Sequence, residues 1–295
     1  MARVAVVGIG GIGGVFAAVL IRAGHDVLLC SRRAFSCLQV QSPVIPSDTV
    51  VRALTTARDV PDDWPSADWV LIAVKAHQTT TIQPWLERLV DPASRIVALQ
   101  NGLGAAPELA RAGSGAPVVD TVVYCGAVSP EPGRVVHSGG LRLIAADTAA
   151  GRDLRELLAS TPMSVELTAD FVTAQWRKLM LNCAANGITA LTRRPLGVFS
   201  RPAALAGARA LLIEAQQIAV ALGAGVSLAD VQSIIGDLAA ATAATVEPSM
   251  LQDRLAGRPT EHHALYGAVV DAAARIGRTA PLHQLMQQLL AAGDP

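Results

Sequence analysis

Hydrophobic positions in the first half of the chain fall into short runs that end at glycine or polar residues. They are rich in Val, Ile and Leu and occupy residues 4–7, 27–30, 69–74, 96–99 and 118–124. Such continuous β-branched runs are typical of strands buried on both faces of a parallel sheet. A longer apolar stretch over residues 12–21, stopped by Gly24, predicts a helix between the first two strands.

The pattern beyond residue 124 is less regular. Residues 130–133 predict a turn, and residues 134–136 and 141–145 predict two strands joined as a hairpin by Ser138-Gly139-Gly140. Residues 34–66 are rich in proline and polar side chains and predict no particular element. His137 is interpreted as a strand-end residue.

From Asp170 onward the pattern is helical, with abundant Ala and Leu. The predicted helices cover residues 173–191, 205–222, 228–245 and 282–292. A further helix is expected to start near Pro248, and Thr260 is expected to cap another, with Glu261 at its first position. The predicted fold class is therefore α/β, with a Rossmann-type doubly wound sheet in residues 1–167 and an all-α domain in residues 168–295.

A glycine-rich turn follows the first strand and reads Gly8-Ile9-Gly10-Gly11-Ile12-Gly13, with the spacing G-x-G-x-x-G. Gly8 allows a tight turn, Gly10 lets a pyrophosphate approach the backbone, and Gly13 lets the helix pack on the strand. The N-terminus of the helix offers N–H groups and a partial positive charge to phosphates. This strand–turn–helix context favours a dinucleotide site over a glycine turn without a ligand, and it makes residues 8–13 candidate cofactor-binding residues.

The second predicted strand ends in Ser31-Arg32-Arg33, and no acidic residue occurs between Val27 and Ser47. An acidic side chain here is typical of NAD specificity, because it binds the ribose 2′-hydroxyl, whereas arginine accommodates a 2′-phosphate. The sequence therefore predicts NADPH/NADP⁺ as cofactor, with Ser31 and Arg32 at the phosphate. The alternative is that the arginines are ordinary solvated loop residues.

Two polar residues follow the next two predicted strands. Lys75 comes after the strand at 69–74, and Asn101 follows the strand at 96–99 and precedes Gly102. Ligands of open α/β sheets bind beyond the carboxyl ends of the strands, so both side chains are candidates to border the nicotinamide and the substrate. A solvated loop lysine and an asparagine in a turn are the alternatives.

A polar stripe marks the helix predicted over residues 173–191. Lys178, Asn182 and Asn186 are spaced four residues apart, and apolar residues flank them. Asparagine is a poor helix former, and buried polar groups need partners, which a substrate can supply. The alternative is that the stripe is the solvated side of an amphipathic helix. Glu261, near a positive helix terminus, is a candidate fixed anion, although a solvated first-turn glutamate is common.

Composition narrows the class of protein. The chain has 295 residues, zero net charge, 51% hydrophobic residues and only 4 Trp, 2 Tyr and 4 Phe. Zero charge and few aromatic residues argue against nucleic acid or an anionic membrane as partner. Four scattered cysteines without a C-x-x-C pair argue against a metal site or a disulfide framework and suggest a cytoplasmic protein. The glycines and the strand–helix pattern of the apolar N-terminal run argue against a signal peptide, and no other run is expected to be long and uncharged enough to span a bilayer.

Five motifs in order make the chain similar to the ketopantoate reductase (2-dehydropantoate 2-reductase) family. They are GIGGIG at 8–13, VKAHQ at 74–78, QNGLG at 100–104, WRKLMLNCAANGITAL at 176–191 and PSMLQDRLAGRPTE at 248–261. The resemblance covers nearly the whole chain. It implies a Rossmann domain and a helical domain with the active site in the cleft between them, and NADPH-dependent reduction of a 2-oxo acid to a 2-hydroxy acid.

The resemblance also implies roles for single residues. Lys178 corresponds to the family's general acid, and Glu261 corresponds to a carboxylate that helps to hold the substrate and the lysine. Asn182, Asn186 and Ser249 correspond to substrate-binding positions, and Lys75 and Asn101 correspond to positions beside the nicotinamide. No metal is required. A lysine close to the carbonyl oxygen stabilises the charge left by hydride transfer and can donate a proton.

The chain departs from the family pattern at two places. His262 and His263 follow Glu261 where the family often has a hydrophobic residue and an acid, and Val246 stands where some members carry a polar residue. These departures leave ketopantoate as the leading substrate and another branched 2-oxo acid or small ketone as the alternative. A non-catalytic NADPH-binding sensor is the alternative of another class. The apolar faces of the helices at 205–222 and 282–292 are compatible with a homodimer.

Overall fold

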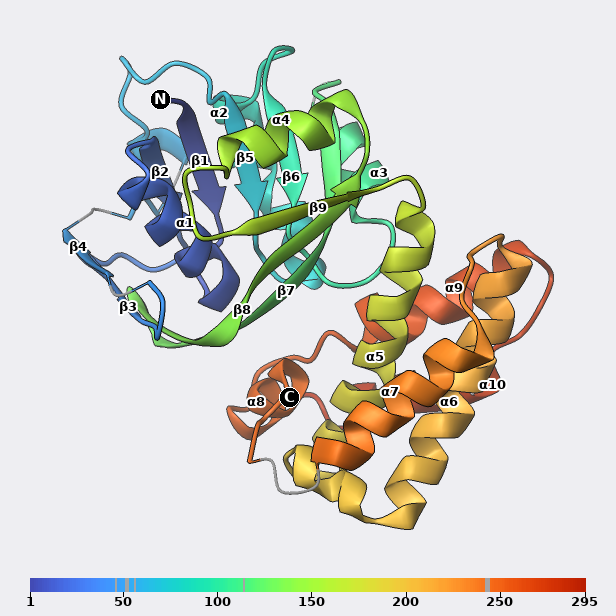
Figure 1. Cartoon of the computed structure of the whole chain (residues 1–295). Coiled ribbons are helices and arrows are strands. Elements are labelled where there is room, and N and C mark those ends of the chain that lie inside the picture. Colours follow the sequence, from blue (N-terminus) through green and yellow to red (C-terminus); the bar gives the residue numbers. More distant parts are fainter. Residues whose placement is uncertain (46, 51–52, 56, 114, 242–244) are drawn as a thin grey trace. The chain divides into compact units, whose positions relative to one another are not determined.

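The computed structural model describes the chain apart from residues 46, 51–52, 56, 114 and 242–244 (Figure 1). It contains two compact units, Met1–Phe171 and Val172–Pro295. The division predicted from the sequence, between residues 167 and 168, falls inside the strand Ser164–Thr168. A mixed α/β sheet followed by helices confirms the predicted fold class.

The first unit is built on one sheet with the strand order β2-β1-β5-β6-β7-β8-β3-β4, and β9 pairs with β8. In the part of this order that reads β2-β1-β5-β6-β7, each strand pairs with its neighbours in parallel, as in a Rossmann-type sheet. The strands are β1 (Arg3–Val7), β2 (Asp26–Cys30), β3 (Cys37–Gln41), β4 (Ser47–Val50), β5 (Trp69–Ile72), β6 (Arg95–Ala98), β7 (Val118–Glu131), β8 (Arg134–Ala146) and β9 (Ser164–Thr168).

The hairpin predicted around residues 138–140 is wrong. β8 continues through this stretch, and the hairpin is instead formed by β7 and β8, which meet at Gly133 (φ +78°). Gly139 and Gly140 have positive φ and lie where the β7–β8 register shifts, so they form an irregularity within the strand. His137 therefore lies inside β8, 3% exposed, with Nδ1 2.8 Å from Ser42 Oγ.

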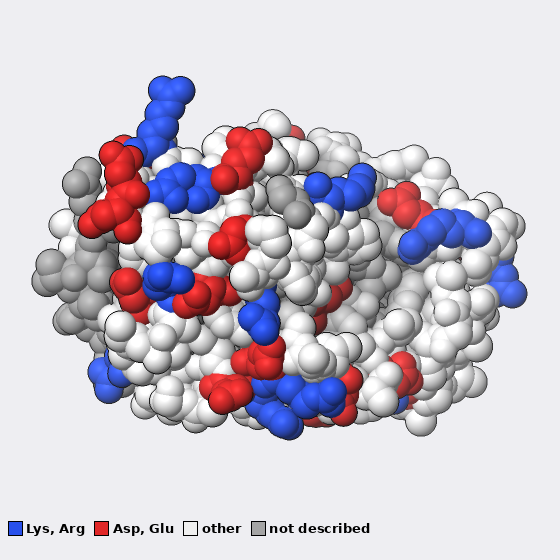
Figure 2. All heavy atoms as spheres, turned by 90° about the horizontal axis from the view of Figure 1, so that it is seen from above, with Lys and Arg blue, Asp and Glu red and all other residues white. Residues whose placement is uncertain are grey.

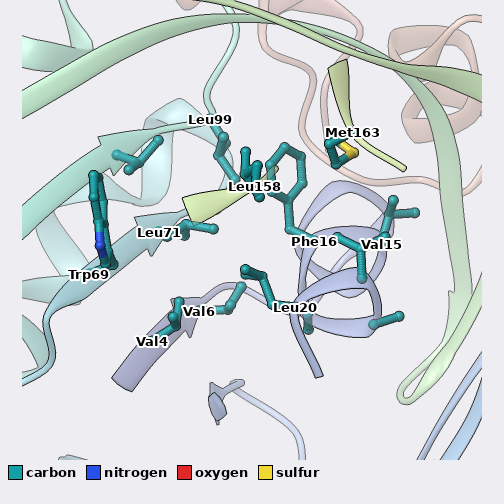
Figure 3. Packing of buried hydrophobic residues seen from close by; sticks show 14 of the residues in the cluster. Val4, Val6, Val15, Phe16, Leu20, Trp69, Leu71, Leu99, Leu158 and Met163 are labelled. Carbon is teal, nitrogen blue, oxygen red and sulfur yellow. The ribbon is translucent and has the colours of Figure 1, made fainter. Parts of the chain in front are cut away.

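Helices cover both faces of the sheet (Figure 1). α1 (Gly11–Arg22) and α4 (Ala149–Leu157) pack on one face, and α2 (Gln83–Leu89) and α3 (Ala105–Ala112) pack on the other. Figure 3 shows the first core, in which Val4 and Val6 of β1 and Leu71 of β5 face Phe16 and Leu20 of α1. The intervening strand residues face the second core, which explains why these strands are hydrophobic at every position.

The second unit is helical. Its described residues form α5 (Phe171–Thr192, which starts in the first unit), η3 (Leu196–Ser200), α6 (Pro202–Ala221), α7 (Leu228–Ala240), α8 (Ser249–Leu255), a π-helical turn η5 (His263–Gly267), α9 (Ala268–Arg275) and α10 (Pro281–Ala292). The helix predicted over 228–245 is thus observed as far as Ala240, and residues 242–244 lie outside the described residues. The fully buried Tyr266 donates to the carbonyl of Cys183 at 2.5 Å. A Cβ at Gly187 would lie 1.7 Å from the Tyr266 hydroxyl, so this contact requires glycine.

α6 is long and apolar enough to pass a test for membrane-spanning helices that uses length and composition alone. A single such helix is weak evidence, because core helices of soluble proteins pass the test as well.

Within α6, the Glu214 carboxylate accepts the backbone N–H groups of Leu282 and His283, at 3.1 and 2.9 Å, and lies 2.7 Å from His283 Nδ1. Glu214 therefore caps the N-terminus of α10.

Glu214 makes the stability of the second unit sensitive to acid. Burial alone would raise the pKa of its carboxyl, but the His283 side chain and the two backbone donors outweigh burial, so the pKa is lowered. A lowered folded-state pKa contributes stability above the ordinary value of 4.5, and that contribution is lost as the pH falls through the lowered value.

We expect Glu214→Gln to lower the unfolding free energy at neutral pH by about 1–3 kcal/mol, because a hydrogen-bonded charge is lost. The deficit should shrink as the pH falls from 4.5 through the lowered folded-state pKa, below which the wild-type carboxyl is protonated in the folded protein as well. Urea unfolding of both proteins at several pH values measures this. A deficit that stays constant down to acid pH would contradict it.

Charges of both signs are mixed on the face shown in Figure 2, where acidic side chains lie beside basic ones. Exposed ion pairs such as Arg142–Glu166 and Arg134–Glu131 likewise bring opposite charges together on the first unit. A mixed surface of this kind does not build the one-sided field that attracts polyanions.

Candidate active site

The glycine turn has the geometry that a pyrophosphate requires. Gly8 turns the chain at the end of β1 with φ +99°, and its N–H donates to the carbonyl of Cys30 at 2.9 Å. A Cβ at Gly13 would lie 2.0 Å from the carbonyl oxygen of Gly8, so α1 packs closely on the turn. A Cβ at Gly10 would meet no atom within 4 Å, which leaves open space beside the backbone.

The start of α1 supplies the donors. α1 begins at Gly11, and the first N–H groups of a helix have no intrahelical acceptor. Ile9 is buried and Ile12 packs against the same core, so the peptide backbone is the part of both residues that is suited to bind a phosphate. A Cβ at Gly11 would lie 2.3 Å from the carbonyl oxygen of Ala127 in β7, a packing requirement that the motif alone did not indicate. These residues fit a dinucleotide.

Basic residues lie directly beside this turn. Val7 pairs with Cys30 in the β1–β2 register, so Ser31 and Arg32 follow β2 at the edge where Gly8 follows β1. The Ser31 N–H donates to the carbonyl of Leu54 at 2.9 Å, which fixes the strand end. Arg32 is exposed. A hydroxyl and a guanidinium, which are groups suited to bind a phosphate, therefore follow β2 at this edge.

Lys75 and Asn101 follow strands that end at the same edge of the sheet. Val7, Ile72 and Ala98 are consecutive partners across β1, β5 and β6. Lys75 precedes the 3₁₀ helix η2 (Ala76–Ile82), and both Lys75 and Asn101 are partly exposed.

Gln100 connects the two strand ends, a role that the sequence analysis missed. It is 8% exposed, and its Nε2 donates to the carbonyl of Val74 at 3.1 Å and to Thr79 Oγ1 at 2.8 Å. Its only signal in the sequence is its place immediately before Asn101-Gly102. Gln100 therefore holds together the backbone segments that carry Lys75 and Asn101.

In the second unit, α5 presents the predicted polar stripe. Lys178 is partly exposed, whereas Asn182 and Asn186 are 8% and 6% exposed. Asn186 Oδ1 accepts the Met250 N–H at 3.2 Å and the Ser249 hydroxyl at 3.3 Å, and its Nδ2 lies 3.4 Å from Asn182 Oδ1. The two asparagines are thus buried polar groups connected to α8, and the solvated-face alternative is wrong for them.

One backbone group determines which atoms donate and which accept in this chain of hydrogen bonds. The Met250 N–H is necessarily a donor, so Asn186 presents its carbonyl oxygen to α8 and its amide to Asn182. Asn182 consequently turns its oxygen toward Asn186.

The predicted cap at Thr260 is displaced by one residue. The carbonyl of Glu261 accepts the Leu265 N–H at 3.1 Å, and the helical residues begin at His262, so Glu261 precedes the helix. The Thr260 hydroxyl contacts Asp294 instead of capping the backbone of the helix. Glu261 is only 6% exposed, which contradicts the alternative of a solvated first-turn glutamate.

The two histidines after Glu261 differ in their surroundings. His262 Nδ1 lies 3.2 Å from Asp294 Oδ2, whereas His263 is exposed and its Nδ1 lies 3.1 Å from Gln287 Nε2. In the part of the chain that the structure describes, no group of three or more His, Cys, Asp or Glu is placed to hold a metal ion. The cysteine thiols of Cys30 and Cys183 are buried, and burial raises their pKa well above its ordinary value.

Comparison with known proteins identifies the family. The profile described as "Ketopantoate reductase PanE/ApbA" matches residues 4–149, and its C-terminal counterpart matches residues 170–294. A 2-dehydropantoate 2-reductase from Caulobacter vibrioides is 31% identical over 98% of both chains. This chain belongs to the ketopantoate reductase family. It is accordingly a 2-dehydropantoate 2-reductase-like oxidoreductase, in a family of NAD(P)-dependent reductases.

Solved structures of the ketopantoate reductase family share the fold along the whole chain. A dimeric ketopantoate reductase from Staphylococcus aureus is 25% identical, with a TM-score of 0.88 over 99% of this chain and 98% of that one. A D-mandelate dehydrogenase with NADH and anilino(oxo)acetate has a TM-score of 0.85 over 99% and 97% of the two chains at 18% identity, which shows the fold alone.

Within the family frame, the predicted site residues form two groups. Residues 8–13, Ser31, Arg32, Lys75 and Asn101 all follow carboxyl ends of strands in the first unit. Lys178, Asn182, Asn186, Ser249 and Glu261 belong to the second unit, where hydrogen bonds join the two asparagines to Ser249. Their individual roles stay predictions.

Proposed function

We propose that this chain catalyses the NADPH-dependent reduction of 2-dehydropantoate (ketopantoate) to pantoate. The observation that carries the proposal is the buried chain of hydrogen bonds from α8 through Asn186 to Asn182, one helical turn after Lys178. A sensor would bind NADPH without needing a proton donor such as Lys178 beside this buried stripe.

The first unit would hold the cofactor. The turn at residues 8–13 and the start of α1 would bind the pyrophosphate, and Ser31 and Arg32 would bind the 2′-phosphate. Lys75 and Asn101 would border the nicotinamide. When bound, reduced NADPH supplies a hydride to carbon 2 of the 2-oxo acid.

Lys178 would act as general acid. As the carbonyl carbon gains the hydride, its oxygen becomes negative, and the Lys178 ammonium stabilises that charge and transfers its proton to the oxygen. Lys178 recovers a proton from water after the hydroxy acid leaves. Asn182 would donate its amide to the substrate, and the Glu261 carboxylate would hold the ammonium group and accept a hydrogen bond from the substrate.

The proposal has a second candidate for the substrate, which differs from ketopantoate in its side chain. The exposed Val246, together with His262 and His263, departs from the family pattern, so another branched 2-oxo acid or small ketone is the second candidate. The reaction chemistry is the same for both substrates.

We also propose that the chain forms a homodimer in the cytoplasm. Light scattering tests whether it is a dimer.

Steady-state oxidation of NADPH with a panel of 2-oxo acids tests the proposal. We expect kcat/KM for ketopantoate to be at least about tenfold above that for straight-chain 2-oxo acids, because a buried apolar contact discriminates by this order. Negligible turnover of ketopantoate beside a better oxo acid favours the alternative substrate. No turnover of any carbonyl compound, with NADPH still bound, favours the sensor.

A further inference from the structure

A largely buried carboxylate after α10 contacts the segment that carries Glu261. Asp294 Oδ2 accepts the Thr260 N–H at 2.9 Å and the Thr260 hydroxyl at 3.1 Å, and it lies 3.2 Å from His262 Nδ1. His262 Nδ1 also lies 3.2 Å from the Thr260 hydroxyl oxygen. Thr260 and His262 are the residues immediately before and after Glu261.

Asp294 is in turn held by Arg254 of α8. Arg254 Nη1 lies 3.4 Å from Asp294 Oδ1, and Nη2 donates to the carbonyl of Leu290 near the end of α10 at 2.8 Å. The side chains of Arg254 and Asp294 are 9% and 12% exposed. A Cβ at Gly293 would lie 2.4 Å from Arg254 Nη1, so the backbone after α10 approaches the guanidinium as closely as only glycine permits.

These contacts fix the backbone on both sides of Glu261. Asp294 accepts hydrogen bonds from Thr260 on one side and lies beside His262 on the other, and the carbonyl of Glu261 itself accepts the Leu265 N–H at 3.1 Å. The direction in which the Glu261 side chain leaves the backbone is thereby determined. Catalytic groups must be held closely, because a misplacement of about 1 Å can cost 100-fold in rate.

We infer that Asp294 is a positioning residue, which acts on catalysis by orienting Glu261. The inference rests on the role of Glu261 in the proposed function. The departure of His262 from the family pattern has a physical use in this arrangement, since its imidazole contacts Asp294 from the far side of Glu261.

The test is a double-mutant cycle between Asp294 and Glu261. Asp294→Asn keeps the shape of the side chain but removes the charge that faces Arg254 and His262. In the wild-type background we expect it to lower kcat/KM for the 2-oxo acid by about 10–100-fold and to leave the KM for NADPH unchanged. In a Glu261→Gln background the same substitution should change kcat/KM less than twofold, because its target is already gone.

Glu214→Gln is the matched control. Like Asp294, Glu214 is a largely buried carboxylate that contacts two protein donors and one histidine Nδ1. Its two donors are the backbone N–H groups of Leu282 and His283, and its side chain is 13% exposed. Glu214 differs in that it holds the other end of α10. We expect this variant to lose stability while it keeps kcat/KM within about twofold of the wild type at a temperature where it is folded.

Each outcome bears on a separate statement. Equal losses from Asp294→Asn in both backgrounds, or an equal loss in Glu214→Gln, would overturn the positioning role in favour of a general effect on folding. An active Asp294→Asn beside an inactive Glu261→Gln overturns the inference alone. Full activity of Glu261→Gln removes Glu261 from the proposed function itself.

Discussion

Lys178→Ala is expected to lower kcat by about two to four orders of magnitude while NADPH still binds. The physical reason is the loss of the positive charge and of the transferable proton at the oxygen that becomes negative. The residues assigned to the cofactor lie in the other unit, so the dissociation constant for NADPH should stay within about twofold. Stopped-flow turnover and fluorescence titration measure the two quantities.

Two further variants separate the possible roles of Lys178. Lys178→Arg keeps a positive charge but holds its proton too firmly to release it, so we expect it to stay at least about tenfold below the wild type. Arg177→Ala removes the neighbouring cation of α5, which is half-exposed and pairs with Asp230 at 2.7 Å. Arg177→Ala is the control and should keep the kcat of the wild type. An unchanged kcat in Lys178→Ala would remove Lys178 from the mechanism.

Arg32→Ala is expected to raise the KM for NADPH by about 10–100-fold, which corresponds to one charge-assisted contact of about 1.5–3 kcal/mol. The KM for NADH should change little, because NADH has no 2′-phosphate to lose. Steady-state kinetics with both cofactors measure the ratio.

Arg134→Ala is the matched control for the cofactor, because Arg134 is an exposed arginine of the same unit that pairs with Glu131 in the β7–β8 hairpin. Its kinetics with both cofactors should match those of the wild type. If the wild type uses NADH as well as NADPH, or if Arg32→Ala changes both alike, the assignment of the 2′-phosphate to Arg32 is wrong.

The parts of the fold that local chemistry determines could be predicted from the sequence. The glycine turn is one of these parts. The turn itself requires the positive φ of Gly8, and the helix that follows requires the close packing at Gly13. The strands β1, β2, β5 and β6 were also evident, since burial on both faces makes them largely hydrophobic.

The parts that depend on distant residues could not be predicted in the same way. Gly139-Gly140 has the composition of a turn, and only pairing with β7 makes it an irregularity within a strand. Thr260 has the composition of a helix cap, but Asp294, 34 residues later in the chain, takes its N–H and hydroxyl. The bond between Asn186 and Ser249 spans 63 residues, so spacing on α5 predicted the stripe without its partner.

The transfer of a labelled hydride tests the central claim most directly. The wild-type enzyme is incubated with ketopantoate and NADPH that carries deuterium at the transferable position of the nicotinamide, and the product is analysed by mass spectrometry and NMR. The account predicts pantoate with one deuterium at carbon 2, formed in the wild type and reduced by about two to four orders of magnitude in Lys178→Ala. Absence of deuterated hydroxy acid from ketopantoate and from every other 2-oxo acid tried would contradict it.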